Sequence, residues 1–291
     1  MPNRTLGIDH PVVAVRDHQA TLAHYRAIGF SPSPLSYHPW GTVLSLMMFR
    51  DNFIEVIGVH DRSKFGTNSV GGFCYGRNVG AFLDSGEGLS LVALHSKDAD
   101  GDFSTLTSRG LPSQGRIDFR RATVKADGTP DVAVVSLGLF LNEDQPGMSH
   151  FICHQHRPEL IWVPQWQHHE NGAHAVTCVS YVAKRPRDLL PRFEAMYAGA
   201  VLEEDGLMVD TGCGLFRVLT PEAVTKHYGH MPLPRWPDHS PHGIAITLAT
   251  SRFDELEPLW KRNGVDYRRS PSNTLLLEPR LYGNVILEFA P

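Results

Sequence analysis

The chain has 291 residues, 42% of them hydrophobic, with 27 basic and 31 acidic side chains and a formal charge of −4. This length predicts about two domains of ~150 residues each, and the balanced charge argues against nucleic acid as a partner. No apolar stretch reaches the ~20 residues of a membrane span and no signal peptide opens the chain, so we expect a cytoplasmic protein without membrane contacts.

One order of elements recurs four times along the chain. In the first copy, a strand at residues 7–15 precedes a helix at 18–28 that stops at Gly29, a common end signal for helices. The copy closes with strands at 42–49 and 52–59. The second copy has a strand at 88–94, a helix ending at Gly110, and strands near 117–125, 132–141 and 149–155.

The third and fourth copies repeat this order in the second half of the chain. The third has a strand at 173–179, a helix at about 187–197, and strands near 201, 207 and 215–219. The fourth has a strand at 242–248, a helix at 253–262 and a closing strand at 284–289. Each copy alone would bury only one face of its sheet, so the copies must pair to form a core.

The repeats therefore predict an α+β fold of four βαβββ modules, paired into two domains. The first domain covers residues 1–162 and the second covers 173–291. Residues 163–172, which are rich in polar side chains and contain Pro164 and Gly172, form the expected linker.

This plan resembles the vicinal oxygen chelate superfamily, which includes glyoxalase I and the extradiol ring-cleaving dioxygenases. The superfamily plan covers essentially the whole chain. Within it, residues 8–17 (IDHPVVAVRD), 38–42 (HPWGT) and 53–59 (FIEVIGV) are similar to the glyoxalase-like group. The resemblance implies two cup-shaped sheets, each able to hold a divalent metal on its inner wall. It does not fix the reaction, because one fold hosts several chemistries.

The resemblance places a metal site in the second cup, which the first and last strands of its modules line. His174 and His242 lie on the first strands of the third and fourth modules, and Glu288 lies on the last strand. Two imidazoles and one carboxylate suit a non-haem Fe(II) centre, although Mn, Zn or Ni would also fit. Glu288 stands in an apolar run, where a carboxylate is paired or bound to a cation. The alternative is that these are ordinary core or rim residues.

The first cup offers a second candidate metal site. His10 matches His174 in its module, and Glu55 is another carboxylate within an apolar strand. His38 matches a position of the glyoxalase-like group, and His154 or His156 could add a further ligand. The alternative is a structural hydrogen bond between His10 and Glu55.

Three other residues are candidate catalytic groups. His227 and His230 belong to a Pro-rich stretch that we expect to be a long loop between the third and fourth modules, where an imidazole could act as acid or base. Tyr282 could replace a tyrosine that extradiol enzymes carry before their final glutamate. The residues that align with the His and Tyr of those enzymes are Arg268 or Arg269 and Leu275. Other histidines, among them His18, His95 and His169, are expected in solvent.

The sequence thus favours a metal-dependent enzyme, an Fe(II) extradiol-type dioxygenase acting on a small catechol-like molecule with vicinal oxygens. One alternative is a glyoxalase-like lyase or isomerase that uses a divalent metal as a Lewis acid. Another is a metal-free protein that binds or sequesters a small molecule in a cleft lined by tryptophans. We expect a homo-oligomer, such as a dimer.

Overall fold

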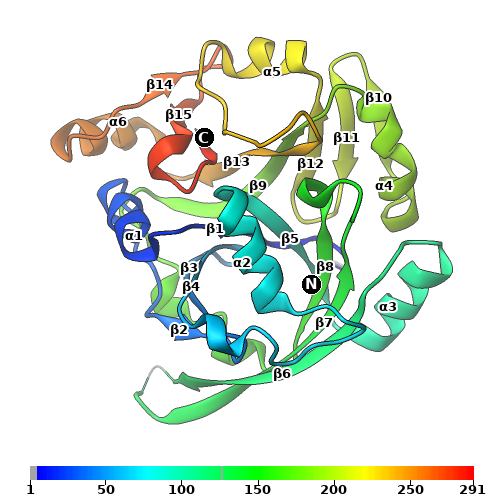
Figure 1. Ribbon diagram of the computed structural model, residues 1–291. Coiled ribbons are helices and arrows are strands. Elements are labelled where there is room, and N and C mark those ends of the chain that lie inside the picture. The colour runs from blue at the N-terminus through cyan, green and yellow to red at the C-terminus, as the bar shows by residue number, and fades with distance from the viewer. Residues whose placement is uncertain (1–4, 126) are drawn as a thin grey trace.

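Two eight-stranded sheets form the frame of the protein (Figure 1). The structure is a computed structural model that describes residues 5–125 and 127–291. The first sheet contains β1 (Ile8–Ala14), β2 (Ser36–Tyr37), β3 (Thr42–Met48), β4 (Phe53–Val59), β5 (Gly88–Ser96), β6 (Gly115–Val124), β7 (Pro130–Phe140) and β8 (His150–Gln155). The second contains β9 (Ala173–Val182), β10 (Ala200–Glu203), β11 (Gly206–Asp210), β12 (Leu215–Leu219), β13 (His242–Thr250), β14 (Arg268–Arg269), β15 (Leu275–Leu277) and β16 (Ile286–Ala290).

The strand order is the same in both sheets and confirms the four modules. The first sheet runs β2-β3-β4-β1-β5-β8-β7-β6, and the second runs β10-β11-β12-β9-β13-β16-β15-β14. The first strands of two modules pair antiparallel at the centre, β1 with β5 and β9 with β13. Each of these strands also pairs in parallel with the last strand of its own module. Every residue of β1 is buried, because both faces of the sheet are covered.

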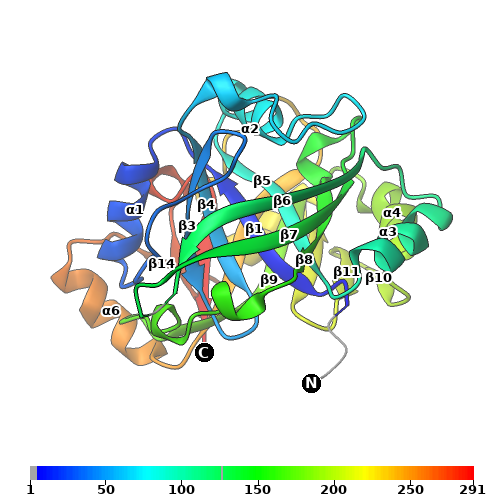
Figure 2. The ribbon, with the colours of Figure 1, turned by 90° about the horizontal axis from the view of Figure 1, so that it is seen from below.

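The helices of the modules lie on either side of the region where the central strands of the two sheets meet (Figure 1). They are α1 (His18–Ala27), α3 (Ala99–Ser108), α4 (Leu190–Met196) and α6 (Phe253–Arg262). Helix α1 begins where the Asp17 side chain accepts a hydrogen bond from the amide of Ala20, and the chain leaves it through Gly29 at φ 92°. In both ribbon views α1 lies beside α6, and α3 lies beside α4 (Figures 1 and 2).

Two further helices, which the sequence analysis did not predict, cover the concave faces of the sheets. Helix α2 (Tyr75–Ser85) packs Tyr75, Val79 and Leu83 into the apolar cluster of the first cup. Helix α5 (Pro221–Tyr228) packs onto the second cup through Ala223, Val224 and Tyr228. The prediction of a loop around His227 is therefore wrong, because this residue lies in the last turn of α5.

One hydrophobic core joins the two halves of the chain. It contains Val13 and Tyr25 from the first half and Trp260 and Phe289 from the second. The indole of Trp260 donates a hydrogen bond to the carbonyl of Ile28, 3.2 Å away, across the boundary between the halves. The convex faces of both sheets therefore lie in the interior, and each cup faces outward.

Three histidines that were expected in solvent are buried or partly buried. His18 lies 3.1 Å from the carbonyl of Val56, and His169 bridges the amide of Ser31 and the carbonyl of Met48. His95 contacts the carbonyl of Asp51. The prediction failed because side chains near strand ends and in the 163–172 segment satisfy backbone groups that neighbouring elements leave unpaired.

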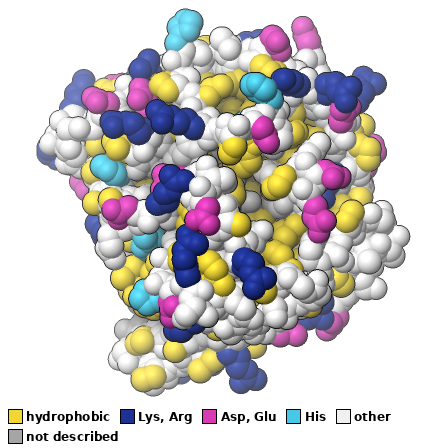
Figure 3. All heavy atoms as spheres, viewed as in Figure 1, with side chains coloured by type: hydrophobic (Ala, Val, Ile, Leu, Met, Phe, Trp, Pro, Cys, Tyr) yellow, Lys and Arg dark blue, Asp and Glu magenta, His cyan; other side chains and the backbone are white. Residues whose placement is uncertain are grey.

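Basic and acidic side chains intermix over the face in Figure 3. None of the helices in the described part of the chain combines the length and apolar content needed to cross a membrane.

Replacing Asn171 by Ala should lower the free energy of unfolding by about 2–4 kcal/mol, because the buried amide serves both the carbonyl of Ile28 and the amide of Ala173. The matched control is Asn263→Ala, which removes an exposed amide from the carbonyl of Ala27 and should cost less than about 1 kcal/mol. Urea denaturation followed by circular dichroism measures both. Equal losses would contradict the assignment of Asn171 as a buried connection between the halves.

Candidate active site

The structure does not bring the predicted ligands of the second cup together. In the antiparallel pair of β9 and β13, Ala173 is opposite Thr250 while His242 is opposite Val182. His174 and His242 therefore lie at opposite ends of the pair, whereas Glu288 lies level with Thr247. His242 is five residues from Thr247, or roughly 17 Å along the strand. The expected Fe(II) ligand set of His174, His242 and Glu288 is thus not assembled.

Both histidines have other surroundings. His174 is exposed, and its Nδ1 lies 3.3 Å from the carbonyl of Gly172. His242 stacks on Trp236 with ring centroids 4.7 Å apart, and its Nδ1 lies 2.8 Å from the carbonyl of Ser240. These contacts belong to the two opposite rims of the sheet.

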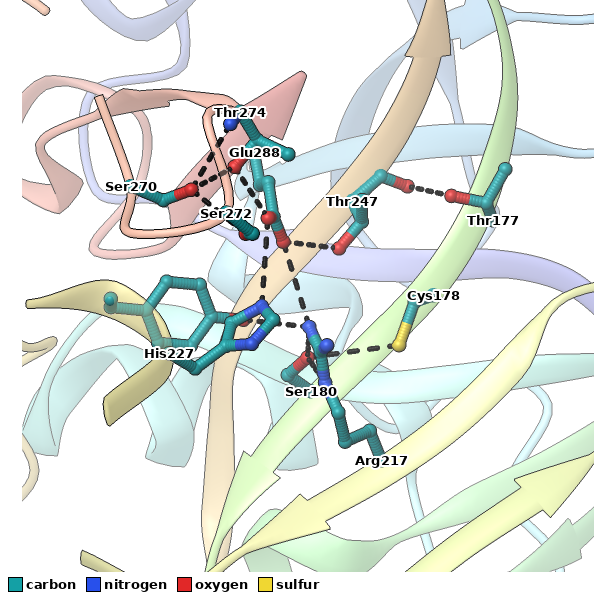
Figure 4. Close-up of polar contacts among 11 residues, drawn as sticks. Thr177, Cys178, Ser180, Arg217, His227, Thr247, Ser270, Ser272, Thr274 and Glu288 are labelled. Carbon is teal, nitrogen blue, oxygen red and sulfur yellow. Dashed lines mark hydrogen bonds and ion pairs between the residues drawn. The ribbon is translucent and has the colours of Figure 1, made fainter. Parts of the chain in front are cut away.

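Glu288 is nevertheless the centre of a polar cluster in the second cup (Figure 4). Thr247 donates to its Oε2 at 2.8 Å and Thr274 donates to its Oε1 at 2.7 Å. Arg217 Nη2 and His227 Nε2 each lie 3.5 Å from the carboxylate. Burial would raise the pKa of Glu288, but the contacts with His227, Thr274 and Thr247 lower it to about 2. Of the predicted catalytic residues, His227 is the one that reaches this carboxylate.

This cluster does not fit a divalent metal. The guanidinium of Arg217 supplies the positive charge opposite Glu288, and it is fixed by Ser180 Oγ and the Tyr228 hydroxyl. The residues of β13 and β9 level with Glu288 are Thr247 and Cys178. Among the residues that the structure describes, no group of three His, Cys, Asp or Glu side chains is placed to hold a metal ion.

The two remaining predicted catalytic residues lie elsewhere. His230 is exposed just beyond the end of α5. Tyr282 is buried in the core between the sheets, where its ring packs against Tyr25 at 6.0 Å and His24 at 6.4 Å. The predicted role of Tyr282 beside a metal at Glu288 is therefore corrected, since this side chain packs on the helix side of the sheet.

In the first cup the structure does bring His10 and Glu55 together. His10 comes from β1 and Glu55 from β4, and His10 Nε2 lies 3.3 Å from Glu55 Oε2. A β-bulge between Ile8 and His10 lets the preceding residue, Asp9, reach the other side of the same ring. Asp9 Oδ1 accepts a hydrogen bond from His10 Nδ1 at 2.5 Å, and Asp9 Oδ2 lies 2.7 Å from His95 Nδ1.

The four groups form two pairs of opposite charge, in which His10, Glu55 and Asp9 are buried and His95 is partly buried. Burial would lower the pKa of His10, but hydrogen bonds with Asp9 and Glu55 outweigh it and raise the pKa to about 9. Burial likewise opposes the charged form of His95, yet Asp9 raises its pKa to about 10. The two imidazoles in turn hold the pKa values of Asp9 and Glu55 below their ordinary range, against the effect of burial. His10 is therefore an imidazolium at neutral pH.

Aromatic side chains enclose this charged pair. Phe53 stacks on His10 at 4.2 Å, and Phe151 meets its edge at 5.7 Å. His38 stacks on Trp40 at 4.7 Å, and burial lowers the pKa of His38 to about 3, so it is neutral. The cavity left inside has a volume of about 30 Å³, room for about two water molecules.

Several buried polar atoms in this cup have no hydrogen-bond partner among the described residues. They are Glu55 Oε1, Trp40 Nε1, Arg121 Nε and Gln155 Oε1, and their side chains all line the cavity. Buried polar atoms without partners are rare in folded proteins, and several around one cavity point to a polar ligand.

Sequence reasoning missed part of this site and misassigned another part. Cys153 and Gln155 of β8 line the cup, so the alternate residues His154 and His156 face away from it and cannot complete a ligand set with His10. Arg121 was not singled out, although it is a charged residue in a strand whose alternate residue, Phe119, is apolar. Asp9, next to His10 in an apolar strand, was a signal that could have been used.

Comparisons with known proteins match this architecture. The family model described as a glyoxalase-like domain matches residues 8–197. A hypothetical protein from Staphylococcus aureus superimposes with a TM-score of 0.68 at 14% identity, over 98% of both chains. A mutant of 4-hydroxymandelate synthase from Streptomyces coelicolor gives 0.58 at 12% identity, over 98% of this chain and 92% of that one.

A third similar structure is a xylose isomerase-like TIM barrel/4-hydroxyphenylpyruvate dioxygenase fusion protein. Its TM-score is 0.53 at 12% identity, over 98% of this chain and 48% of the fusion. At these identities the likenesses establish the fold, and they confirm the expected vicinal oxygen chelate architecture. No curated protein matches the sequence significantly.

The paired imidazoles predict a stability that falls at high pH. The folded pKa values of about 9 and about 10 lie above the ~6.5 of an unfolded histidine. The stabilisation is thus complete below pH ~6.5 and is lost as pH rises through the folded values, on the order of 1 kcal/mol per pH unit for each group. Urea denaturation between pH 7 and pH 10 measures it. His95→Asn should flatten the decline, whereas the exposed control His174→Asn should not. Equal slopes in both variants would contradict the pairing.

Proposed function

Because the chain belongs to the glyoxalase-like domain family, we propose that its first cup is the active site of an enzyme that moves a proton on a small carbonyl compound. The reaction class is that of a glyoxalase-like lyase or isomerase. The observation that carries the proposal is the ion pair of His10 and Glu55, enclosed by aromatic side chains, with one carboxylate oxygen left unpartnered.

The two charged groups suit complementary steps. The imidazolium of His10 can donate its Nε2 proton to a substrate carbonyl oxygen, while Glu55 takes the proton from the adjacent carbon. With an α-hydroxy carbonyl substrate, these two transfers give an enediol. Glu55 then returns its proton to the former carbonyl carbon while the other hydroxyl gives its proton back to His10, which completes an isomerisation without any external oxidant. The enclosed cup strengthens both interactions, because little water competes for them.

Other residues of the site hold these groups in place. Asp9 fixes the ring orientation of His10 through Nδ1, and His95 neutralises Asp9 from the other side. The neutral imidazole of His38 and the guanidinium of Arg121 line the same cavity and can contact polar atoms of the substrate. Substrate and catalytic groups are thus arranged around one buried imidazolium.

A divalent metal, which the family resemblance implies, has an incomplete donor set here. His10 Nε2 and Glu55 could supply two ligands, and Asp9 stands where a carboxylate commonly orients a metal-bound histidine. The described residues provide no third ligand beside them. A bound metal would supply Lewis-acid polarisation of the carbonyl.

Iron-dependent ring cleavage of a catechol-like molecule is the second candidate. It is supported by the fold shared with 4-hydroxymandelate synthase and by the presence of a buried glutamate on the last strand of the second cup. It requires ligands beyond Glu288, and Arg217 stands beside that carboxylate. Proton transfer in the first cup uses an acid and a base that the structure already brings together, so we favour it.

Glu55→Gln should reduce proton transfer by about 10²–10⁴-fold, the usual contribution of a positioned acid or base. The measurement is incorporation of solvent deuterium at carbon in a panel of small α-hydroxy aldehydes and ketones, followed by proton NMR. Glu288→Gln is the matched control, a buried carboxylate on the equivalent inner wall of the other cup, and should leave the rate unchanged. A rate lost in Glu288→Gln and kept in Glu55→Gln would contradict the proposal.

Chelation separates the two candidate functions. We expect deuterium exchange to persist after treatment with EDTA and removal of metal, verified by elemental analysis. Ring cleavage predicts instead that oxygen is consumed with catechols only after anaerobic loading with Fe(II). Oxygen uptake of that kind, with no exchange on the carbonyl panel, would overturn the proposed function.

A further inference from the structure

An apolar groove lies directly outside the first cup. We call it the outer groove; its volume is about 280 Å³, against about 30 Å³ for the cup. It is lined by Ser33, Pro34, Leu35, Ser36, Tyr37, Leu44, Leu46, Arg121, Ala122, Thr123, Val124, Leu160, Ile161 and Trp166. Four of these, Leu44, Leu46, Arg121 and Ile161, also line the cup. The groove and the cup are therefore neighbours across one shared wall.

The shared wall forms where the two edges of the first sheet meet. Strands β2 and β6 are at opposite ends of the strand order, yet they approach each other closely. Arg121 of β6 donates a hydrogen bond from Nη1 to Ser36 Oγ of β2. Its Nε is buried without a partner among the described residues. Arg121 thus lies at the boundary between the cup and the groove, and its Nε–H can donate a further hydrogen bond.

The charge and exposure of the groove define what it would bind. Arg121 is the single charged side chain among its lining residues. Leu35, Tyr37 and Val124 are 43%, 48% and 54% exposed, and they are three of the six large hydrophobic side chains that are exposed in the described part of the chain. A contiguous patch of exposed apolar side chains often marks a binding surface.

We propose that the outer groove binds the aliphatic tail of an amphipathic substrate, a monocarboxylic acid whose carboxylate branches from the chain between the tail and the reacting carbonyl. The carboxylate contacts Arg121 at the shared wall, and the carbonyl end enters the cup. This deepens the proposed function and rests on it for the reaction in the cup. Arg121 can turn from Ser36 to the carboxylate, and its unpartnered Nε and an Nη then make the paired hydrogen bonds that guanidinium and carboxylate favour. The apolar side chains of the groove contact the aliphatic tail of the substrate.

Calorimetric titration with straight-chain carboxylates from butanoate to decanoate tests the tail site without any turnover. The wild type should bind about fourfold tighter for each added methylene until the groove is filled. Val124→Asp should remove this dependence on chain length. Val201→Asp is the matched control, a valine that is also 54% exposed but lies on β10 of the other sheet, and should keep the wild-type dependence. Arg121→Gln should weaken all members of the series by a similar factor.

Three results would overturn the inference. The first is an affinity independent of chain length in the wild type, or an equal effect of Val124→Asp and Val201→Asp. The second is binding of wild type, but not of Val124→Asp, to phosphatidylcholine vesicles with no dependence on free carboxylates, which would make the groove a lipid contact. The third is a change of sedimentation coefficient in Val124→Asp alone, which would make it a contact between two copies.

The tests of the inference and of the proposed function fail separately. Chain-length dependence with unchanged deuterium exchange in Glu55→Gln would support the tail site and reject the reaction. Loss of exchange in Glu55→Gln with flat carboxylate affinities would support the reaction and reject the tail site.

Discussion

A carboxylate buried in a sheet must be neutralised, and the two cups meet this requirement differently. In the first cup Glu55 faces an imidazolium, which a second carboxylate, Asp9, holds in its charged form. In the second cup Glu288 receives two threonine hydroxyls and lies beside the guanidinium of Arg217. An imidazolium can give up and regain a proton, whereas a guanidinium stays protonated. Two buried glutamates on the last strands of their modules are therefore neutralised by a titratable cation in one cup and by a permanent cation in the other.

The module plan could be predicted from the sequence because its signals are local. Apolar strands, helices ended by Gly29 and Gly110, and their order all depend on neighbouring residues, and the structure confirms them. The pairing of His10 with Glu55 was foreseeable for a similar reason, since each polar residue interrupts an apolar strand of the same module. Helices α2 and α5 were missed because they lie between modules, where the repeat gives no guide.

The predicted metal site of the second cup failed because it depended on strand register. His174 and His242 were matched because each lies near the start of a strand. In an antiparallel pair, however, the starts of the two strands lie at opposite ends of the pair. The alternation of residues along β8 separates its two faces but does not tell which face lines the cup. The sequence alone therefore could not decide whether His154 and His156 point into the cup or away from it. The contact of Asp9 with both His10 and His95 depends on a bulge in β1 that spacing does not reveal.

The single core between the sheets also bears on how the chain is divided. The match to the glyoxalase-like family stops at residue 197, after α4, although β9 is already the centre of the second sheet. Strand β9 needs β12 on one side and β13 on the other to satisfy its backbone. A fragment cut at the family boundary would expose two unpaired strand edges and half of the core. The smallest part of the chain that can fold cooperatively around a native first cup is therefore longer than residues 8–197, the segment that the family model matches.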